Sequence, residues 1–138
     1  MATRSNIGIL NQDGTVDYIY CHFDGYPEHN GSILNKHYTT EGKVRMLLEL
    51  GDISILGGNI GEKQDFNNRV KGTCLAYHRD RGEKKNEART CSYVDYTKEY
   101  FEEYVYLFTP GEGWKMRAYG AEYWTKLNSV LEQIENGN

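Results

Sequence analysis

The chain has 138 residues, of which 26% are charged, and a net charge of −4 at pH 7. This length fits one domain spanning 1–138 with a hydrophobic core of its own, and the acidic balance argues against general nucleic-acid binding. No apolar run approaches the roughly 20 residues that span a membrane, and the N-terminus lacks the apolar core of a signal peptide. We therefore expect a cytoplasmic protein with no membrane partner.

The three cysteines are Cys21, Cys74 and Cys91. Their number is odd, they lie far apart, and they match no zinc-binding spacing. Free thiols are the default state in a reducing cytoplasm. We accordingly expect no disulfide, no metal and no cofactor.

The chain begins with a predicted β-hairpin. Asp13-Gly14 is a turn signal between two runs rich in Ile, Val and Tyr, residues 6–10 and 16–23. Because side chains alternate along a strand, Ile19, Cys21 and Phe23 share one apolar face, which we expect to face the core. The opposite, more exposed face carries Val16, Tyr18, Tyr20 and His22.

Two helices are predicted next, over residues 32–38 and 41–50. Thr40 is a good N-cap for the second helix and Gly51 is its stop signal. Its apolar stripe consists of Val44, Leu47 and Leu48. A short apolar stretch follows at 53–56.

The second half of the chain reads as rich in β-structure. We expect strands at 73–78 and 90–94 joined by a basic loop over 79–89, a short helix within 98–103, a hairpin of 104–108 with 114–118, and an amphipathic helix over 121–134 that buries Tyr123, Trp124, Leu127, Leu131 and Ile134. The predicted fold class is therefore α+β, a single domain with a mainly antiparallel sheet and two to four helices packed on one side.

Residues 20–31 hold the densest set of reactive side chains: Tyr20, His22, Asp24, Tyr26 and His29. Histidine and carboxylate together can bind a divalent metal or exchange protons with a substrate. The segment lacks the spacings that identify a metal, and Asp24 also fits ordinary turn chemistry. We take these residues as candidate contacts for a ligand or partner, and we assign no catalytic residue.

A basic segment at 69–89 carries seven Lys/Arg against three Asp/Glu, whereas the chain on either side of it is acidic. Arginine offers fork-like donors that suit phosphates, and a neighbouring tyrosine can stack on a base. Its candidate contact residues are Tyr77, His78, Arg79, Arg81 and Arg89. Asp80 and Glu83 dilute the positive charge, so we expect a small anionic ligand or an acidic protein patch. A solvated segment of mixed charge is the alternative.

A long motif string resembles a family of small, uncharacterised proteins common in bacteriophages and prophages. The string consists of Thr3-Arg4-Ser5-Asn6-Ile7, Asp13-Gly14-Thr15-Val16, Ile19-Tyr20-Cys21-His22-Phe23-Asp24-Gly25-Tyr26-Pro27-Glu28-His29-Asn30-Gly31 and Gly51-Asp52-Ile53-Ser54. The similarity covers the first half well and the second half loosely. It carries no activity with it, but it implies a phage accessory gene expressed in the cytoplasm of a bacterial host. Small phage accessory proteins often disarm host defence by binding a defence protein or by sequestering a nucleotide signal.

Three functions follow as hypotheses. The first is a non-enzymatic phage protein that inhibits a host component, favoured by the resemblance and by the 12 tyrosines, which suit interfaces. The second is a small hydrolase or nuclease that uses His22, Asp24 and His29. The third, a structural virion component, has no positive support in the sequence. Exposed aromatic residues also suggest a symmetric homo-oligomer.

Overall fold

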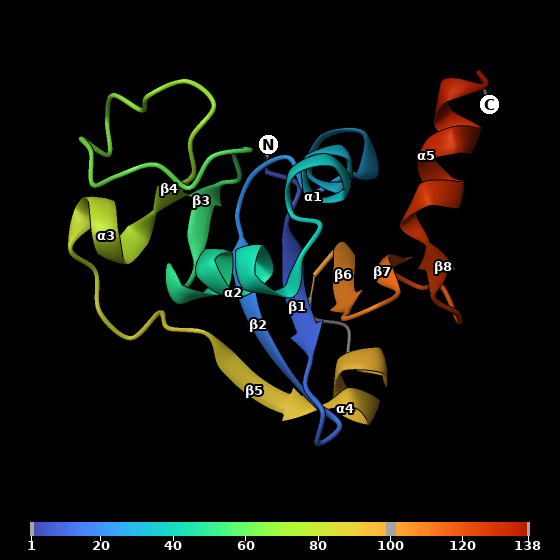
Figure 1. The fold of residues 1–138 in the computed structure, drawn as a ribbon. Coiled ribbons are helices and arrows are strands. Elements are labelled where there is room, and N and C mark those ends of the chain that lie inside the picture. Colours follow the sequence, from blue (N-terminus) through green and yellow to red (C-terminus); the bar gives the residue numbers. More distant parts are fainter. Residues whose placement is uncertain (1, 99–101, 138) are drawn as a thin grey trace.

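The computed structural model describes residues 2–98 and 102–137, which form an eight-stranded mixed sheet with helices packed against it (Figure 1). The strands are β1 (Ser5–Leu10), β2 (Thr15–Cys21), β3 (Ile53–Ile55), β4 (Leu75–Ala76), β5 (Arg89–Ser92), β6 (Tyr104–Thr109), β7 (Gly113–Ala118) and β8 (Thr125–Lys126). The helical elements are the π-helical turn η1 (Pro27–Gly31), α1 (Ser32–His37), α2 (Glu41–Glu49), α3 (Tyr77–Arg81), α4 (Tyr93–Lys98) and α5 (Leu127–Glu135). The predicted α+β class is confirmed.

The strands run in the order β4-β3-β2-β1-β6-β7-β8, and β5 pairs with β2 beside β3. The predicted hairpin of β1 and β2 is confirmed: Asp13 accepts a hydrogen bond from the backbone of Thr15 at 3.0 Å, and Gly14 takes the positive φ of 85° that this turn requires. The hairpin of β6 and β7 is also confirmed. Two neighbouring pairs, β1 with β6 and β2 with β3, are parallel, so the sheet is mixed rather than wholly antiparallel.

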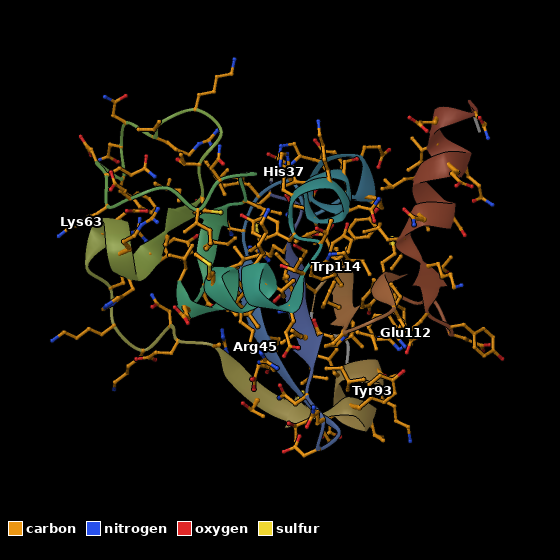
Figure 2. The ribbon with its side chains drawn as sticks, viewed as in Figure 1. His37, Arg45, Lys63, Tyr93, Glu112 and Trp114 are labelled. Atoms are coloured by element: carbon orange, nitrogen blue, oxygen red, sulfur yellow. The ribbon has the colours of Figure 1, made fainter. Side chains whose placement is uncertain are left out.

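One face of the sheet forms the main core under α1, α2 and α5. This face contributes Ile7, Ile9, Ile19, Cys21, Tyr106, Phe108, Trp114 and Met116. As predicted, α2 begins after Thr40, whose hydroxyl accepts a hydrogen bond from the backbone of Lys43, and its stripe of Val44, Leu47 and Leu48 is buried. Trp114 lies below α1 and donates from its indole nitrogen to the backbone oxygen of Tyr38 at 2.8 Å (Figure 2).

The opposite face of the sheet is covered at one end by α4, a helix that the sequence reading did not predict. Its Tyr96 packs on Val16. Val16 is fully buried, although we expected its face of the strand to be the more exposed one. Gly8 makes this approach possible, because a Cβ atom there would lie 2.8 Å from Val16 and 2.9 Å from the Tyr96 ring. The Tyr96 hydroxyl donates to the backbone oxygen of Tyr106 at 2.8 Å. The sheet therefore has helices on both faces, whereas we expected them on one. The larger group of helices covers the face that we expected to form the core.

The second half of the chain departs most from prediction. The expected strand at 73–78 ends after Ala76, where α3 begins, and the strand expected to reach residue 94 ends at Ser92, where α4 begins. β4 pairs with β3 and β5 pairs with β2, so the basic segment joins two strands that do not pair with each other. The last helix begins at Leu127, and Tyr123 is 77% exposed instead of buried. The short helix predicted within 98–103 falls partly on 99–101, outside the described residues.

Candidate functional site

The outward face of β2 places Tyr20 and His22 side by side. The Tyr20 hydroxyl lies 2.7 Å from Nδ1 of His22, within hydrogen-bonding distance, and both side chains are half-buried. Burial raises the pKa of Tyr20, so its hydroxyl stays protonated at neutral pH. The strand alternation predicted from the sequence is confirmed for these two residues.

The segment after β2 is held by a buried amide. The side chain of Asn30 donates to the hydroxyl of Ser5 at 3.4 Å, to the sulfur of Cys21 at 3.3 Å and to the backbone oxygen of Phe23 at 3.3 Å. Gly25 packs so closely on β1 that a Cβ atom there would lie 2.8 Å from Ser5. Much of the motif that resembles the phage family therefore has a structural role: it fastens η1 to the start of β1.

The basic segment contributes a second aromatic group, at the start of α3. The rings of Tyr77 and Phe66 lie 5.7 Å apart, and the guanidinium group of Arg81 lies 4.3 Å from the Phe66 ring and 5.0 Å from the Tyr77 ring. Arg81 also forms an ion pair with Glu83, and its side chain is 49% exposed. Cation–π contacts of this kind hold a long side chain in one orientation.

Asp52 brings these two groups together. Its carboxylate accepts the backbone N–H of Tyr20 at 2.9 Å, and its backbone oxygen accepts the N–H of Tyr77 at 3.3 Å. The pairing of β3 with β2 and with β4 places Asp52 between Tyr20 and Tyr77 on one face of the sheet. The segments 20–31 and 77–89 therefore meet at one surface, which the sequence alone did not establish.

The surface continues past His22 to Phe23, whose ring packs edge-on against the imidazole with centroids 4.5 Å apart. Phe23 is 40% exposed, so our expectation that it faces the core is wrong. The backbone at this point bends away from the strand, and Asp24 takes a positive φ of 58°. We call this surface the aromatic strip; it consists of two groups on either side of Asp52, namely Phe23, His22 and Tyr20, and Tyr77, Phe66 and Arg81.

The arginines predicted to hold an anion are paired with carboxylates. Arg79 donates to the backbone oxygens of Ile60, Gly61 and Cys74 and forms an ion pair with Asp80 at 2.9 Å. Arg89 donates to both carboxylate oxygens of Asp52, at 2.9 and 2.8 Å. With Arg81 bound to Glu83, all three guanidinium groups have carboxylate partners. This arrangement favours a structural role for Arg79 and Arg89.

The remaining predicted contact residues lie at the margins of the strip. Nδ1 of His78 lies 2.7 Å from the backbone oxygen of Glu83, and the rings of Tyr26 and His29 are 6.2 Å apart. His29 is also held by Asn30 at 3.0 Å. Within residues 2–98 and 102–137, no group of three or more His, Cys, Asp or Glu side chains is placed to hold a metal ion.

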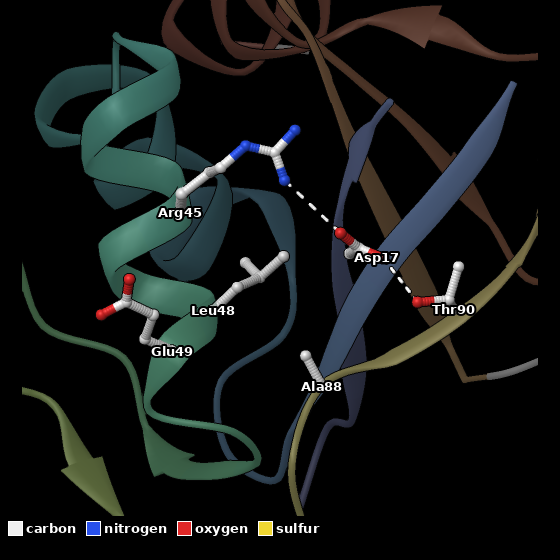
Figure 3. Close-up of a pocket in the computed structure, with 6 residues that line it drawn as sticks. All are labelled: Asp17, Arg45, Leu48, Glu49, Ala88 and Thr90. Carbon is white, nitrogen blue, oxygen red and sulfur yellow. Dashed lines mark hydrogen bonds and ion pairs between the residues drawn. The ribbon is translucent and has the colours of Figure 1, made fainter. Parts of the chain in front are cut away.

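A separate cavity of about 350 Å³ lies between α2 and the strands β2 and β5 (Figure 3). Its polar side chains bind one another: Asp17 accepts from Arg45 at 3.4 Å and from the hydroxyl of Thr90 at 2.6 Å. Arg45 also donates to Asn11 and Glu41. Since the lining cation and its neighbours are mutually satisfied, this cavity is a weaker candidate than the strip.

No protein-family model, curated protein or solved structure matches the chain. None of the helices in the described part of the chain is long and apolar enough to cross a membrane.

Proposed function

We propose that the protein is a phage-encoded, non-enzymatic binding protein that inhibits a host component, in the first place a defence protein, by contacting it through the aromatic strip. The phage origin comes from the resemblance of the motif string. The mode of action is supported by one observation above the others: aromatic side chains from β2, α3 and two loops share one partly exposed surface.

The composition of the strip suits a protein interface. Tyrosine and arginine are enriched among the residues that contribute most to binding between proteins. Tyr77 and Arg81 are held in place by stacking before any partner arrives, so their ordering costs less free energy on binding. Such a patch favours a protein partner over a small ligand, for which a concave pocket is usual.

Sequestration of a phosphate-bearing nucleotide is the less favoured form of the same proposal. A phosphate at Arg79, Arg81 or Arg89 has to compete with a carboxylate that already occupies the guanidinium group. The alternative of a hydrolase or nuclease has less support, because His22 bonds to Tyr20 and His29 to Asn30, and no contact among the described residues joins the two histidines.

The test is capture of a partner from a bacterial lysate with the tagged protein and a matched set of variants. We expect the wild type to retain a specific partner and Phe66→Ala combined with Arg81→Ala to lose it. Tyr123→Ala is the control, since it removes an exposed aromatic ring outside the strip. Circular dichroism checks that each variant is folded.

A thermal-shift screen against linear and cyclic nucleotides separates the two forms of the proposal. We expect no change in the melting temperature with any of them. A shift in melting temperature that Arg89→Ala abolishes would show that the ligand is a nucleotide and not a protein. A partner retained equally by the wild type and the strip variant would show that the strip is not the contact surface.

A further inference from the structure

A groove of about 420 Å³ runs between α5 and the segment formed by η1 and α1. At one end the side-chain amide of Asn35 on α1 donates to Asn128 on α5 at 2.8 Å. From Asn128 to Glu135 the groove follows about two turns of α5, or about 10 Å at 1.5 Å per residue. Its length therefore matches a short helical segment laid along α5.

The groove combines an apolar floor with acidic walls. Leu131 and Ile134 of α5 line it and are only half-buried: Leu131 packs partly against the core, and Ile134 belongs to neither core cluster. Glu28 lies on one wall, and Glu132 and Glu135 lie on the other. Among the described residues, neither lysine nor arginine lines the groove, so its charge is of one sign.

The charge decides between the possible occupants. A second copy that presented its own α5 would bring Glu132 and Glu135 towards the same residues, and like charges repel. The chain's own basic segment lies around α3, at the opposite edge of the sheet from α5 (Figure 1), and three of its four arginines are paired with carboxylates. A basic segment from another protein satisfies both the apolar floor and the acidic walls.

We infer that the groove beside α5 docks a short, basic amphipathic helix of a partner protein. Apolar side chains of that helix, spaced three and four residues apart, cover Leu131 and Ile134, which is the usual way in which a helix enters a groove. Its lysines or arginines face Glu28, Glu132 and Glu135. This contact is independent of the aromatic strip and adds a second surface to the protein.

The probe for the experiment is a synthetic peptide of about 16 residues, long enough to form a helix, with leucines along one face and lysines beside them. Its control has glutamate at every lysine position. Fluorescence anisotropy measures binding to the full chain, and amide chemical shifts identify the residues contacted. We expect the lysine peptide to shift residues 28–35 and 128–135, and the glutamate peptide to bind at least about tenfold more weakly.

Glu132→Gln combined with Glu135→Gln tests the acidic wall without changing side-chain size. We expect this variant to bind the lysine peptide roughly threefold to tenfold more weakly than the wild type at low salt, since exposed ion pairs contribute modestly. This loss of affinity should shrink as salt is added. The matched control is Glu62→Gln with Glu87→Gln. These two exposed residues lie outside the groove, and Figure 2 places Lys63, the neighbour of Glu62, on the far side of the molecule from α5.

Several outcomes would overturn the inference: absence of binding by the lysine peptide, equal binding of both peptides, or chemical shifts centred on the aromatic strip. Sedimentation that shows a dimer built on α5 would identify a second copy as the occupant and would also overturn it. The strip variant Phe66→Ala with Arg81→Ala should bind the peptide as the wild type does. Failure of one surface is therefore distinguishable from failure of the other.

Discussion

Asp52 accepts both terminal N–H groups of Arg89, at 2.9 and 2.8 Å, and so ties the turn after α2 to the start of β5. The same carboxylate accepts the backbone N–H of Tyr20. One half-buried acid thus fixes the relative position of the two segments that form the aromatic strip. Its ionisation should be visible in the stability of the protein.

Burial raises the pKa of Asp52, although the bonds from Tyr20 and Arg89 act in the opposite direction. A raised carboxyl pKa means that the folded protein binds the proton more tightly than the unfolded chain does. That contribution to stability is complete below about pH 4 and is lost as pH rises through the folded pKa. We expect the free energy of unfolding of the wild type, minus that of Asp52→Asn, to fall as pH increases from about 3 to 6.

Urea unfolding at a series of pH values measures this difference. Asp13→Asn is the control of opposite sign, because hydrogen bonds from Thr15 lower the pKa of Asp13. Its stabilising effect is present above the unfolded pKa and is lost as pH falls through the folded pKa. If the difference in free energy of unfolding between the wild type and Asp52→Asn stays constant or rises with pH, the pKa of Asp52 is not raised in the folded protein.

Asp80 anchors the long loop between β3 and β4, and its replacement should be costly. Its side chain is fully buried and accepts from Arg79, from the backbone of Ala76 at 2.8 Å and from the backbone of Gln64 at 3.1 Å. We expect Asp80→Asn to lower the free energy of unfolding by about 3 kcal/mol, since it removes the carboxylate partner of the Arg79 charge. Glu83→Gln breaks only the half-exposed pair with Arg81, so a loss below about 1 kcal/mol is expected. Equal losses in the two variants would show that the loop does not depend on Asp80.

Gly8 allows α4 to pack against the second face of the sheet, and even one methyl group should disturb it. A Cβ atom at this position meets Val16 and the Tyr96 ring at under 3 Å. We expect Gly8→Ala to destabilise the protein by about 1–3 kcal/mol through overpacking. Gly42→Ala in α2 meets no atom within 4 Å, so it should be neutral or stabilising by up to about 1 kcal/mol. Thermal unfolding of both variants checks the pair, and the idea fails if Gly8→Ala matches Gly42→Ala.

The three thiols should react in a fixed order. Burial raises the pKa of Cys21 to about 12 and raises that of Cys74 as well, and both side chains are fully buried. Burial also raises the pKa of Cys91, but that residue is only partly buried, on the edge strand β5. We expect iodoacetamide to modify Cys91 first, and Cys21 and Cys74 only on unfolding. Peptide mass spectrometry measures the order, and early labelling of Cys21 would show that η1 opens readily.

The sequence predicted the local elements well where turn and cap residues were explicit. Gly14 and Thr40 correctly marked the first hairpin and the start of α2. The start of α4 also had a signal, which we missed: Ser92 accepts the backbone N–H of Asp95 at 3.0 Å, and Ser-x-x-Asp is a typical helix start.

The candidate site was harder to predict because its parts depend on pairing between distant segments. Tyr20 and Tyr77 lie on the same surface only because β3 bridges β2 and β4, and the periodicity of neither strand specifies this order. Asp52 appeared in the motif string without a role, since its partners Tyr20 and Arg89 are remote in sequence. The excess of positive charge at 69–89 is visible in the sequence, but the pairing of its arginines with carboxylates depends on side-chain geometry that the sequence does not show.

The position of β1 also has a consequence for how the protein is made. β1 leaves the ribosome well before β6, which is one of its two neighbours, with Ser5 opposite Tyr104. The hairpin with β2 can form early, but the central ladder cannot close until β6 has also been synthesised. Contacts of such long sequence separation slow folding. A truncated chain that ends before β6 would leave one edge of β1 unpaired, which makes it a template for aggregation.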